Sequence, residues 1–333
     1  PIYVSGHATD RIGKLKAENL NVKVSKTQLI ADVRLIGLPD AQSTNIDAKI
    51  TKLNTTTADL RLLLPPKQKL PEQIMRLGNI TMNGRFTGFP KDFVDYGNIN
   101  TTLGKLKTDV QMNLTNKVPQ YSGDITVDNL ALGKLINNNK LGSVSLVANI
   151  KGQGFNINDL HTFVKGKISQ ITFNNYHYIN IGVDGEVNKK LFSGKYTVDD
   201  PNINLNFEGS VNLNDPAVPR YNFTANVIKI DLQKLNLLKE GTLKETFVIA
   251  GNADLDLSGK NIDNIEGTAK LRNVKLIQPN RTFDIAKLDL IASSNNNGRK
   301  LIVNSDIADA EFTGSFKFLQ LRDAFQNYAH TYF

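Results

Sequence analysis

Apolar side chains recur at every second position through most of this chain. Leu20, Val22 and Val24 give an early example, and Leu205 and Phe207 a later one. Strict alternation places such side chains on one face of a β-strand and leaves the other face to polar residues. Gly, Asn and Asp separate the runs, and these residues favour tight turns. The pattern therefore predicts an all-β protein in which antiparallel strands are joined by short turns.

A few segments need separate treatment. The alternation continues through Ala58, Leu60, Leu62 and Leu64, which predicts another strand there. Asn83-Gly84 predicts a tight turn or a bulge. Short helical turns are expected where a proline opens a connection or where apolar residues lie three or four positions apart, at Pro71–Leu77, within Leu132–Leu141 and at the start of Gln320–Tyr332.

Two segments 100 positions apart share one pattern. PQYSGDITVDNLALGKL (119–135) and PRYNFTANVIKIDLQKL (219–235) match in proline, tyrosine, a strand valine and a final Lys-Leu pair. A long-range repeat on top of a strand-turn rhythm predicts an elongated, repetitive antiparallel sheet. We expect a first β-segment over 1–78, a continuing repetitive sheet over 79–318 with repeat units near 119–218 and 219–318, and the start of a short helix at 319–333.

Composition limits the classes of function. The chain has 333 residues, 40% of them apolar, and no cysteine, which excludes disulfides and thiolate chemistry and fits a periplasmic or secreted protein. The net charge is +8, but the basic residues are scattered, so we expect solvated strand faces and no nucleic-acid partner. Mild attraction to anionic lipid head groups is the alternative interpretation. Because the chain starts at Pro1 without methionine, we expect it to be an internal fragment of a longer protein.

Signals for catalysis are sparse. The four histidines are His7, His161, His177 and His330, and they are not spaced as metal ligands. Asp254 and Asp256 alternate with leucines, which places both carboxylates on one strand face, towards solvent. Nothing singles out a carboxylate pair for glycoside hydrolysis. We therefore predict no catalytic residue, no metal site and no cofactor.

The apolar strand faces are the more informative candidate. If two such faces meet, they form the dry core of a sandwich. If the strands curl into an open trough, the same residues line a groove that can hold acyl chains at about 0.8 kcal/mol per buried CH₂. Alternation alone does not separate these two interpretations. In either case we predict the following inward-facing residues: Leu146, Ala148, Ile150, Ile181, Val183, Leu205, Phe207, Phe223, Ala225, Val227, Leu255, Leu257, Leu290 and Val303.

The segment 80–105, ITMNGRFTGFPKDFVDYGNINTTLGK, carries the most specific signal. It resembles Bacteroidetes-type TamB proteins, of the translocation-and-assembly-module family related to AsmA, in the motifs Gly84-x-Phe86-Thr87-Gly88, Phe93-Val94-x-Tyr96-Gly97 and Thr102-x-Gly104. The stretch YSGDITVDNLALGKL (121–135) resembles that family's repeated units, and Leu319–Phe333 resembles its Leu/Phe/Tyr-rich helix.

The resemblance implies a fold, a location and a function. Proteins of this family are anchored in the inner membrane of Gram-negative bacteria and cross the periplasm. Their sheet folds lengthwise into a β-taco with a hydrophobic inner groove, and they act in outer-membrane biogenesis with a barrel partner. This chain is then expected to be a periplasmic, non-enzymatic conduit whose groove holds phospholipid acyl chains during lipid transfer and outer-membrane protein assembly or secretion. The outer-membrane barrel assembly protein would contact regions outside it.

Two other hypotheses stay open. The first is a structural or adhesin-like β-protein with a closed core and no lipid groove. The second and weaker one is a polysaccharide-active β-solenoid enzyme, which would need a convergent acidic or basic cluster. An interior that is open and apolar along its length favours the conduit over the closed core.

Overall fold

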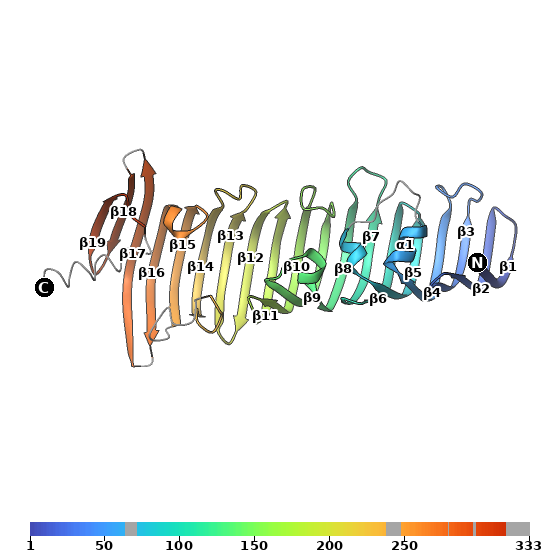
Figure 1. The fold of residues 1–333 in the computed structure, drawn as a ribbon, viewed down its shortest axis with the longest axis horizontal. Coiled ribbons are helices and arrows are strands. Elements are labelled where there is room, and N and C mark those ends of the chain that lie inside the picture. The colour runs from blue at the N-terminus through green and yellow to red at the C-terminus, as the bar shows by residue number, and fades with distance from the viewer. Residues whose placement is uncertain (64–71, 238–247, 279, 296–297, 318–333) are drawn as a thin grey trace. The chain divides into compact units, whose positions relative to one another are not determined.

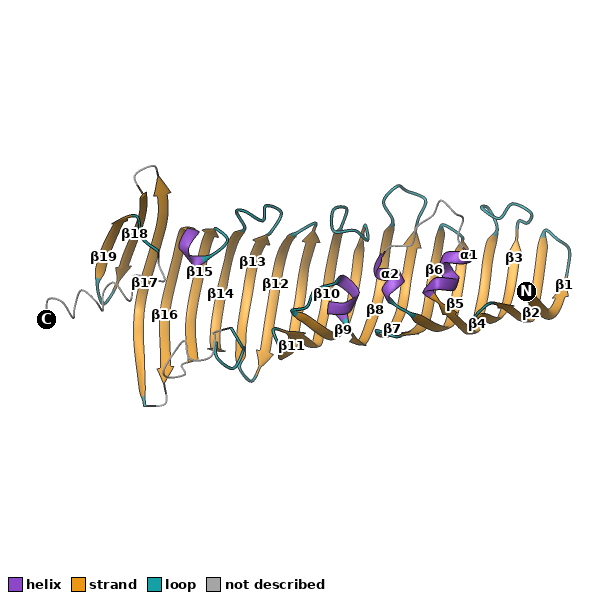
Figure 2. Cartoon of the chain, viewed as in Figure 1, coloured by secondary structure: helices purple, strands orange, loops and turns teal. Residues whose placement is uncertain are grey.

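A computed structural model describes residues 1–63, 72–237, 248–278, 280–295 and 298–317. The predicted all-β class is confirmed, because these residues form nineteen antiparallel strands and only a few short helices (Figures 1 and 2). The chain divides into two compact units, Pro1–Gly182 and Val183–Phe333. The boundary between them lies within strand β11 (Tyr176–Asn188). The segment boundaries expected at 78 and 318 stay predictions.

The first unit is an antiparallel meander of ten strands, β1 to β10. Each strand pairs with the next strand in the chain, as expected when strands are joined by short turns. The strands are β1 (Ile2–Thr9), β2 (Lys14–Val24), β3 (Thr27–Ile36), β4 (Asn45–Thr56), β5 (Asn79–Phe89), β6 (Asp92–Thr101), β7 (Gly104–Asn113), β8 (Gln120–Leu130), β9 (Leu141–Gln153) and β10 (His161–Phe173). The helices are α1 (Thr57–Leu63), α2 (Glu72–Arg76) and α3 (Leu132–Ile136).

The second unit is also an antiparallel meander, and β16 and β17 are its longest strands. Strands β12 to β19 again pair in chain order. They are β12 (Leu191–Asp200), β13 (Ile203–Asn212), β14 (Arg220–Asp231), β15 (Val248–Ser258), β16 (Glu266–Gln278), β17 (Arg281–Asn295), β18 (Gly298–Ser305) and β19 (Asp309–Gly314), with one short 3₁₀ helix at Ile262–Asn264.

Two of the β-bulges that interrupt the pairing contain an asparagine with a positive φ. Asn19 (φ 49°) lies in the bulge of β2, and Asn129 (φ 47°) lies in the bulge of β8. Asparagine tolerates this left-handed conformation better than most residues. The backbone N–H of Asn19 donates to the Asp32 carboxylate at 2.9 Å, and that of Asn129 donates to the Ser145 hydroxyl at 2.9 Å. Each bulge bends its strand, and the side chain opposite satisfies the freed donor.

The strand predicted through Ala58, Leu60 and Leu62 is wrong, because these residues form helix α1. Alanine, leucine and arginine are strong helix formers, and the segment is too short for its period to exclude a helix. The Thr56 hydroxyl also accepts a hydrogen bond from the backbone N–H of Asp59 at 3.1 Å, as at a helix N-terminus. The fourth residue of that prediction, Leu64, is outside the described residues.

The other local predictions have mixed outcomes. The helical turns expected near Pro71–Leu77 and Leu132–Leu141 are present as α2 and α3. Asn83-Gly84 makes no turn and lies inside β5, opposite the point where β4 bulges between Ile50 and Leu53. The helix expected at Gln320–Tyr332 lies outside the described residues.

Candidate functional site: apolar rows that cross the strands

A continuous row of apolar side chains crosses all ten strands of the first unit. Residues directly opposite each other in an antiparallel pair share a face, so the register defines the row. At roughly 4.8 Å between strands, ten strands give a row of about 43 Å. The row consists of Val4, Val22, Leu29, Leu53, Met82, Ile99, Leu106, Val127, Leu146 and Ile168.

Two further rows run beside the first. Small residues are frequent in both, and small side chains let neighbouring large ones pack over them. One consists of Leu20, Ala31, Ile50, Gly84, Gly97, Thr108, Ile125, Ala148 and Gly166. The other consists of Ala8, Ala17, Val33, Ala48, Phe86, Asp95, Val110, Gly123, Ile150 and Val164. We call these three rows together the apolar face of the first unit.

This apolar face is only partly covered. In the row that starts at Val4, Val127 is 7% exposed, Val4 is 65% exposed and the other eight residues are half-buried. The interior of a closed sandwich would bury most of such residues completely. The leucine, isoleucine and methionine side chains of this row therefore keep part of their apolar surface free.

The second unit has an equivalent apolar face, defined by two rows. Aromatic side chains pack along it: the Phe207 ring lies 5.2 Å from that of Tyr196 and 4.7 Å from that of Phe223. One row consists of Gly194, Gly209, Phe223, Leu255, Ala269, Leu290, Val303 and Ala310. The other consists of Tyr196, Phe207, Ala225, Ala253, Leu271, Leu288 and Ser305.

The opposite face of the strands is mainly polar in both units, with scattered exposed apolar residues such as Val147. In the first unit, the Arg85 guanidinium donates to both oxygens of Asp47, at 2.9 and 2.8 Å. These hydrogen bonds hold the pKa of the Asp47 carboxyl below its usual range. In the second unit, Lys195 pairs with Glu208 at 3.2 Å. The expectation that Asp254 and Asp256 face solvent is confirmed, because both are exposed.

All fourteen residues predicted to face inward are at least half-buried, and Ala148 is fully buried. Leu146, Ala148 and Ile150 lie on the apolar face of the first unit. Leu205 pairs with Val227 and Leu257 pairs with Tyr221, next to the two rows of the second unit. Phe207, Phe223, Ala225, Leu255, Leu290 and Val303 belong to those rows, and Ile181 and Val183 are half-buried in β11. That these residues line a lipid groove stays a prediction.

The sequence prediction missed most of the apolar face in strands β1 to β8. Met82, Ile99 and Leu106 belong to it, and their every-second-position pattern was already visible in the sequence. It also missed Asp95, which lies in phase with Phe93 and Ile99 along β6 and therefore points to the apolar face. Thr108 Oγ1 donates to Asp95 Oδ2 at 2.7 Å, and burial raises the pKa of this carboxyl.

Helix α3 covers one end of the apolar face in the first unit. Its residues Leu132 and Leu135 pack against a buried cluster of Val127, Leu130 and Val144. The α2 side chain Arg76 donates to the backbone carbonyl of Leu135 at 3.0 Å and so ties the two helices together. In Figure 2, α3 is the unlabelled purple helix beside the β9 and β10 labels, drawn in front of the strands. Val127, Leu130 and Val144 are therefore buried beside this helix, while other buried residues of the unit, such as Ala31, lie elsewhere.

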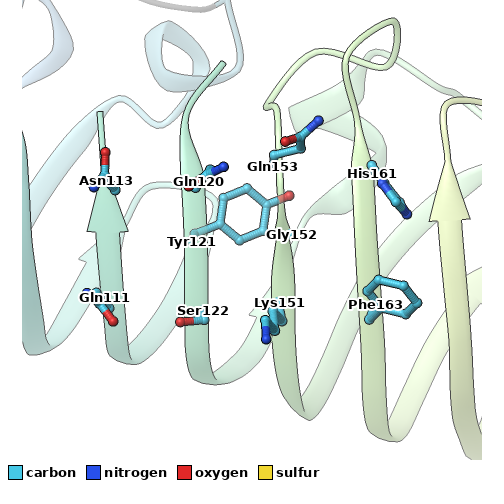
Figure 3. A pocket seen from close by; sticks show the side chains of 10 residues that line it. All are labelled: Gln111, Asn113, Gln120, Tyr121, Ser122, Lys151, Gly152, Gln153, His161 and Phe163. Carbon is cyan, nitrogen blue, oxygen red and sulfur yellow. The ribbon is translucent and has the colours of Figure 1, made fainter. Parts of the chain in front are cut away.

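A hollow of about 560 Å³ lies on the polar face of strands β7 to β10 (Figure 3). Its lining combines polar side chains such as Gln111, Ser122 and Lys151 with the aromatic ring of Phe163. Tyr121 is in phase with Gly123 and therefore lies on the apolar face, where its hydroxyl lies 2.6 Å from the Thr162 hydroxyl and donates to the Gly154 carbonyl at 3.1 Å. The hollow can offer hydrogen bonds, but it is not part of the apolar face.

Neither a cluster of metal ligands nor a membrane-spanning helix is found among the described residues. Among them, no group of three or more His, Asp or Glu side chains could hold a metal ion. His177 has an ordinary partner, since its Nδ1 lies 2.8 Å from the Thr172 hydroxyl. In this part of the chain no helix combines the length and the apolar character needed to cross a membrane.

In comparisons with known proteins, the chain matches no protein-family model, no curated protein and no solved structure.

Proposed function

We propose that this chain is a non-enzymatic segment of a lipid conduit, in which the apolar faces hold phospholipid acyl chains. The observation that carries the proposal is the row from Val4 to Ile168, which stays apolar across ten strands and is half-buried at eight of its positions. Acyl chains gain about 0.8 kcal/mol for each CH₂ group removed from water, so an extended apolar surface binds them without specific contacts.

Similar apolar positions recur on successive strands, which favours movement of an acyl chain along the rows over tight binding at one site. Neighbouring positions such as Leu53, Met82 and Ile99 present similar apolar surface at intervals of one strand. Similar neighbouring sites have similar affinities, so a bound chain meets no deep energy minimum that would trap it. Lipid head groups would remain at the polar edges of the strands.

The proposal includes a sheet that curls lengthwise around the apolar face of each unit into a groove. The bulges at Asn19 and Asn129 support it, because bulges bend strands and increase their twist. A curled sheet also explains why the apolar side chains are half-buried although few are completely buried.

The wider setting follows the resemblance of residues 80–105 to TamB and AsmA-like proteins. We propose that the chain acts in the periplasm as part of a longer, inner-membrane-anchored protein that serves outer-membrane biogenesis. An outer-membrane barrel assembly protein would be its partner through other regions. The alternative, a structural or adhesin-like protein with a closed core, would require a partner surface that covers the apolar rows.

Photocrosslinking in cells tests the proposal. A benzophenone amino acid replaces Leu255 on the apolar face, and in a matched control it replaces Asp256, the exposed neighbour on the polar face. After expression in the periplasm of a Gram-negative host and irradiation, mass spectrometry should find phospholipid attached at position 255 and none at 256. Equal lipid capture at both positions, or capture at neither, would overturn the proposal.

A further inference from the structure

A single carboxylate interrupts the apolar face of the first unit. Asp95 in β6 lies directly opposite Phe86 of β5 on one side and Val110 of β7 on the other. Along its own strand, Phe93 and Gly97 are its neighbours on the same face. In the three rows that define this face, every other described position holds an apolar residue, a glycine or a threonine. An ionisable group at this position is costly unless it has partners.

The hydrogen bonding of Asp95 is incomplete. Thr108 donates one hydrogen bond to Oδ2 at 2.7 Å, and no other group in the described part of the chain donates to this carboxylate. An ionised carboxylate offers about four acceptor positions. Oδ1 therefore accepts no hydrogen bond from the described residues, and a ligand could supply a donor to it.

No cation in the described part of the chain neutralises this charge. Among the described residues, no Lys or Arg forms an ion pair with Asp95. Lys107 is next to Thr108 on β7, but its side chain lies on the opposite face. Its ammonium group is 5.9 Å from the centre of the Tyr96 ring. The carboxylate thus faces an apolar surface, and no ion pair with the described residues compensates its charge.

Few side-chain atoms cover the strand backbones beside Asp95, and those that do belong to a flexible residue. Gly97 lies directly opposite Gly84, so two neighbouring positions on this face carry no side chain. The methyl group of Met82 lies over Gly97, because a Cβ at position 97 would be 3.1 Å from Met82 Cε. Methionine is flexible and fills irregular space, so its side chain can move aside for a ligand.

We propose that Asp95 and Thr108 form a polar subsite in the apolar face, which binds the primary ammonium group of an amphiphile whose alkyl chain lies along the apolar rows. This inference rests on the proposed function, because the rows must first bind alkyl chains. Charge complementarity selects the ligand, since an ammonium group supplies both the missing donor and the opposite charge. The net charge of +8 repels cations in general, so the local carboxylate has to account for any preference.

Binding of two probes to three proteins tests the subsite. Decylammonium chloride and the neutral decanol have the same chain length, and both are titrated below micelle formation by isothermal calorimetry at neutral pH. The variants are Asp95→Asn, which keeps the shape of the side chain, and Asp109→Asn, a matched control. Asp109 is exposed on the polar face of β7, and its substitution changes the net charge by the same amount as Asp95→Asn.

We expect Asp95→Asn to weaken decylammonium binding about tenfold, the loss of one charge-assisted hydrogen bond. Decanol affinity should stay unchanged, and Asp109→Asn should match the wild type with both probes. A second variant, Thr108→Val, removes the other subsite group and should also weaken decylammonium binding selectively.

The outcomes separate the two proposals. If all proteins bind both probes with unchanged affinities, the subsite is overturned and the apolar groove stands. If neither probe binds the wild type, the groove itself fails and the subsite with it. If Asp109→Asn weakens decylammonium binding as much as Asp95→Asn, the effect is one of net charge and the subsite is also overturned.

Discussion

Gly84 lies so close to the backbone of Tyr96 that a Cβ at position 84 would be 2.2 Å from the Tyr96 carbonyl oxygen. Gly84 also has a φ of 158°, which side chains rarely adopt. Only glycine fits where β5 approaches β6 in this way. The glycine-rich motif on which the family resemblance rests therefore has a structural cause, namely the close approach of two strand backbones under the apolar face.

Gly84→Ala should lower the free energy of unfolding by about 1–3 kcal/mol, because the clash involves backbone and the conformation is strained. Gly13→Ala is the control, since no atom lies within 4 Å of a Cβ at position 13. That control should change stability by less than about 0.5 kcal/mol. Urea unfolding followed by circular dichroism measures both, and equal midpoints for the two variants would contradict the close approach.

Leu235 should contribute strongly to the stability of the second unit. Its side chain has 0% exposure, whereas Leu237, two residues later, is 47% exposed. Leu235→Ala is expected to cost about 2–5 kcal/mol, because it removes buried methyl groups and leaves a cavity. Leu237→Ala should cost no more than about 0.5 kcal/mol. Thermal unfolding of both variants checks this prediction, which fails if the two melting temperatures are equal.

Asp47 should stabilise the folded state only when it is ionised. The hydrogen bonds from Arg85 lower its pKa in the folded state, so its contribution is present above the unfolded-state pKa and is lost as the pH falls through the folded-state value. Both side chains are exposed on the polar face, so Asp47→Asn should cost less than about 1 kcal/mol at pH 7. The cost should disappear in strong acid. A cost that stays constant with pH in urea titrations would exclude the pair as its cause.

Asp95 should have the opposite pH dependence. Burial raises its pKa in the folded state, so folding favours the protonated form. Its contribution to stability therefore decreases as the pH rises from the unfolded-state pKa through the folded-state value. Asp95→Asn should remove this decrease and should gain stability relative to the wild type between acidic and neutral pH. Unfolding titrations at several pH values test the sign, and a relative loss on raising the pH would contradict it.

Local sequence patterns predicted the strands and their faces well. Alternation alone placed Phe223 and Leu255 on the half-buried side, because a period of two is a property of the strand itself. The two repeated segments also make matching contacts: Gly154 donates to the Pro119 carbonyl at 2.9 Å, and Gly259 donates to that of Pro219 at 2.9 Å. The repeat visible in the sequence thus corresponds to the same backbone hydrogen bond in each unit.

The features that depend on pairing were beyond the sequence. Which residue lies opposite Asp95, and so whether that carboxylate finds a partner, depends on the register of β5, β6 and β7. Bulges change the register in ways that alternation does not record, as at Asn129. The helix at Thr57–Leu63 was misread because seven mostly apolar residues fit either period. Side-chain pattern therefore predicted the faces, while the register that connects them into rows needed the structure.

The central claim, that lipid chains contact one face of the strands, is tested most directly by a cysteine scan of β7. The chain has no native cysteine, so single cysteines at positions 105 to 109 can each carry one fluorophore. Leu106 and Thr108 lie on the apolar face, and Lys105, Lys107 and Asp109 lie on the polar face. With phospholipids brominated in their acyl chains, quenching should occur at 106 and 108 and be weak at 105, 107 and 109. Uniform quenching, or none at any of the five positions, would contradict the account.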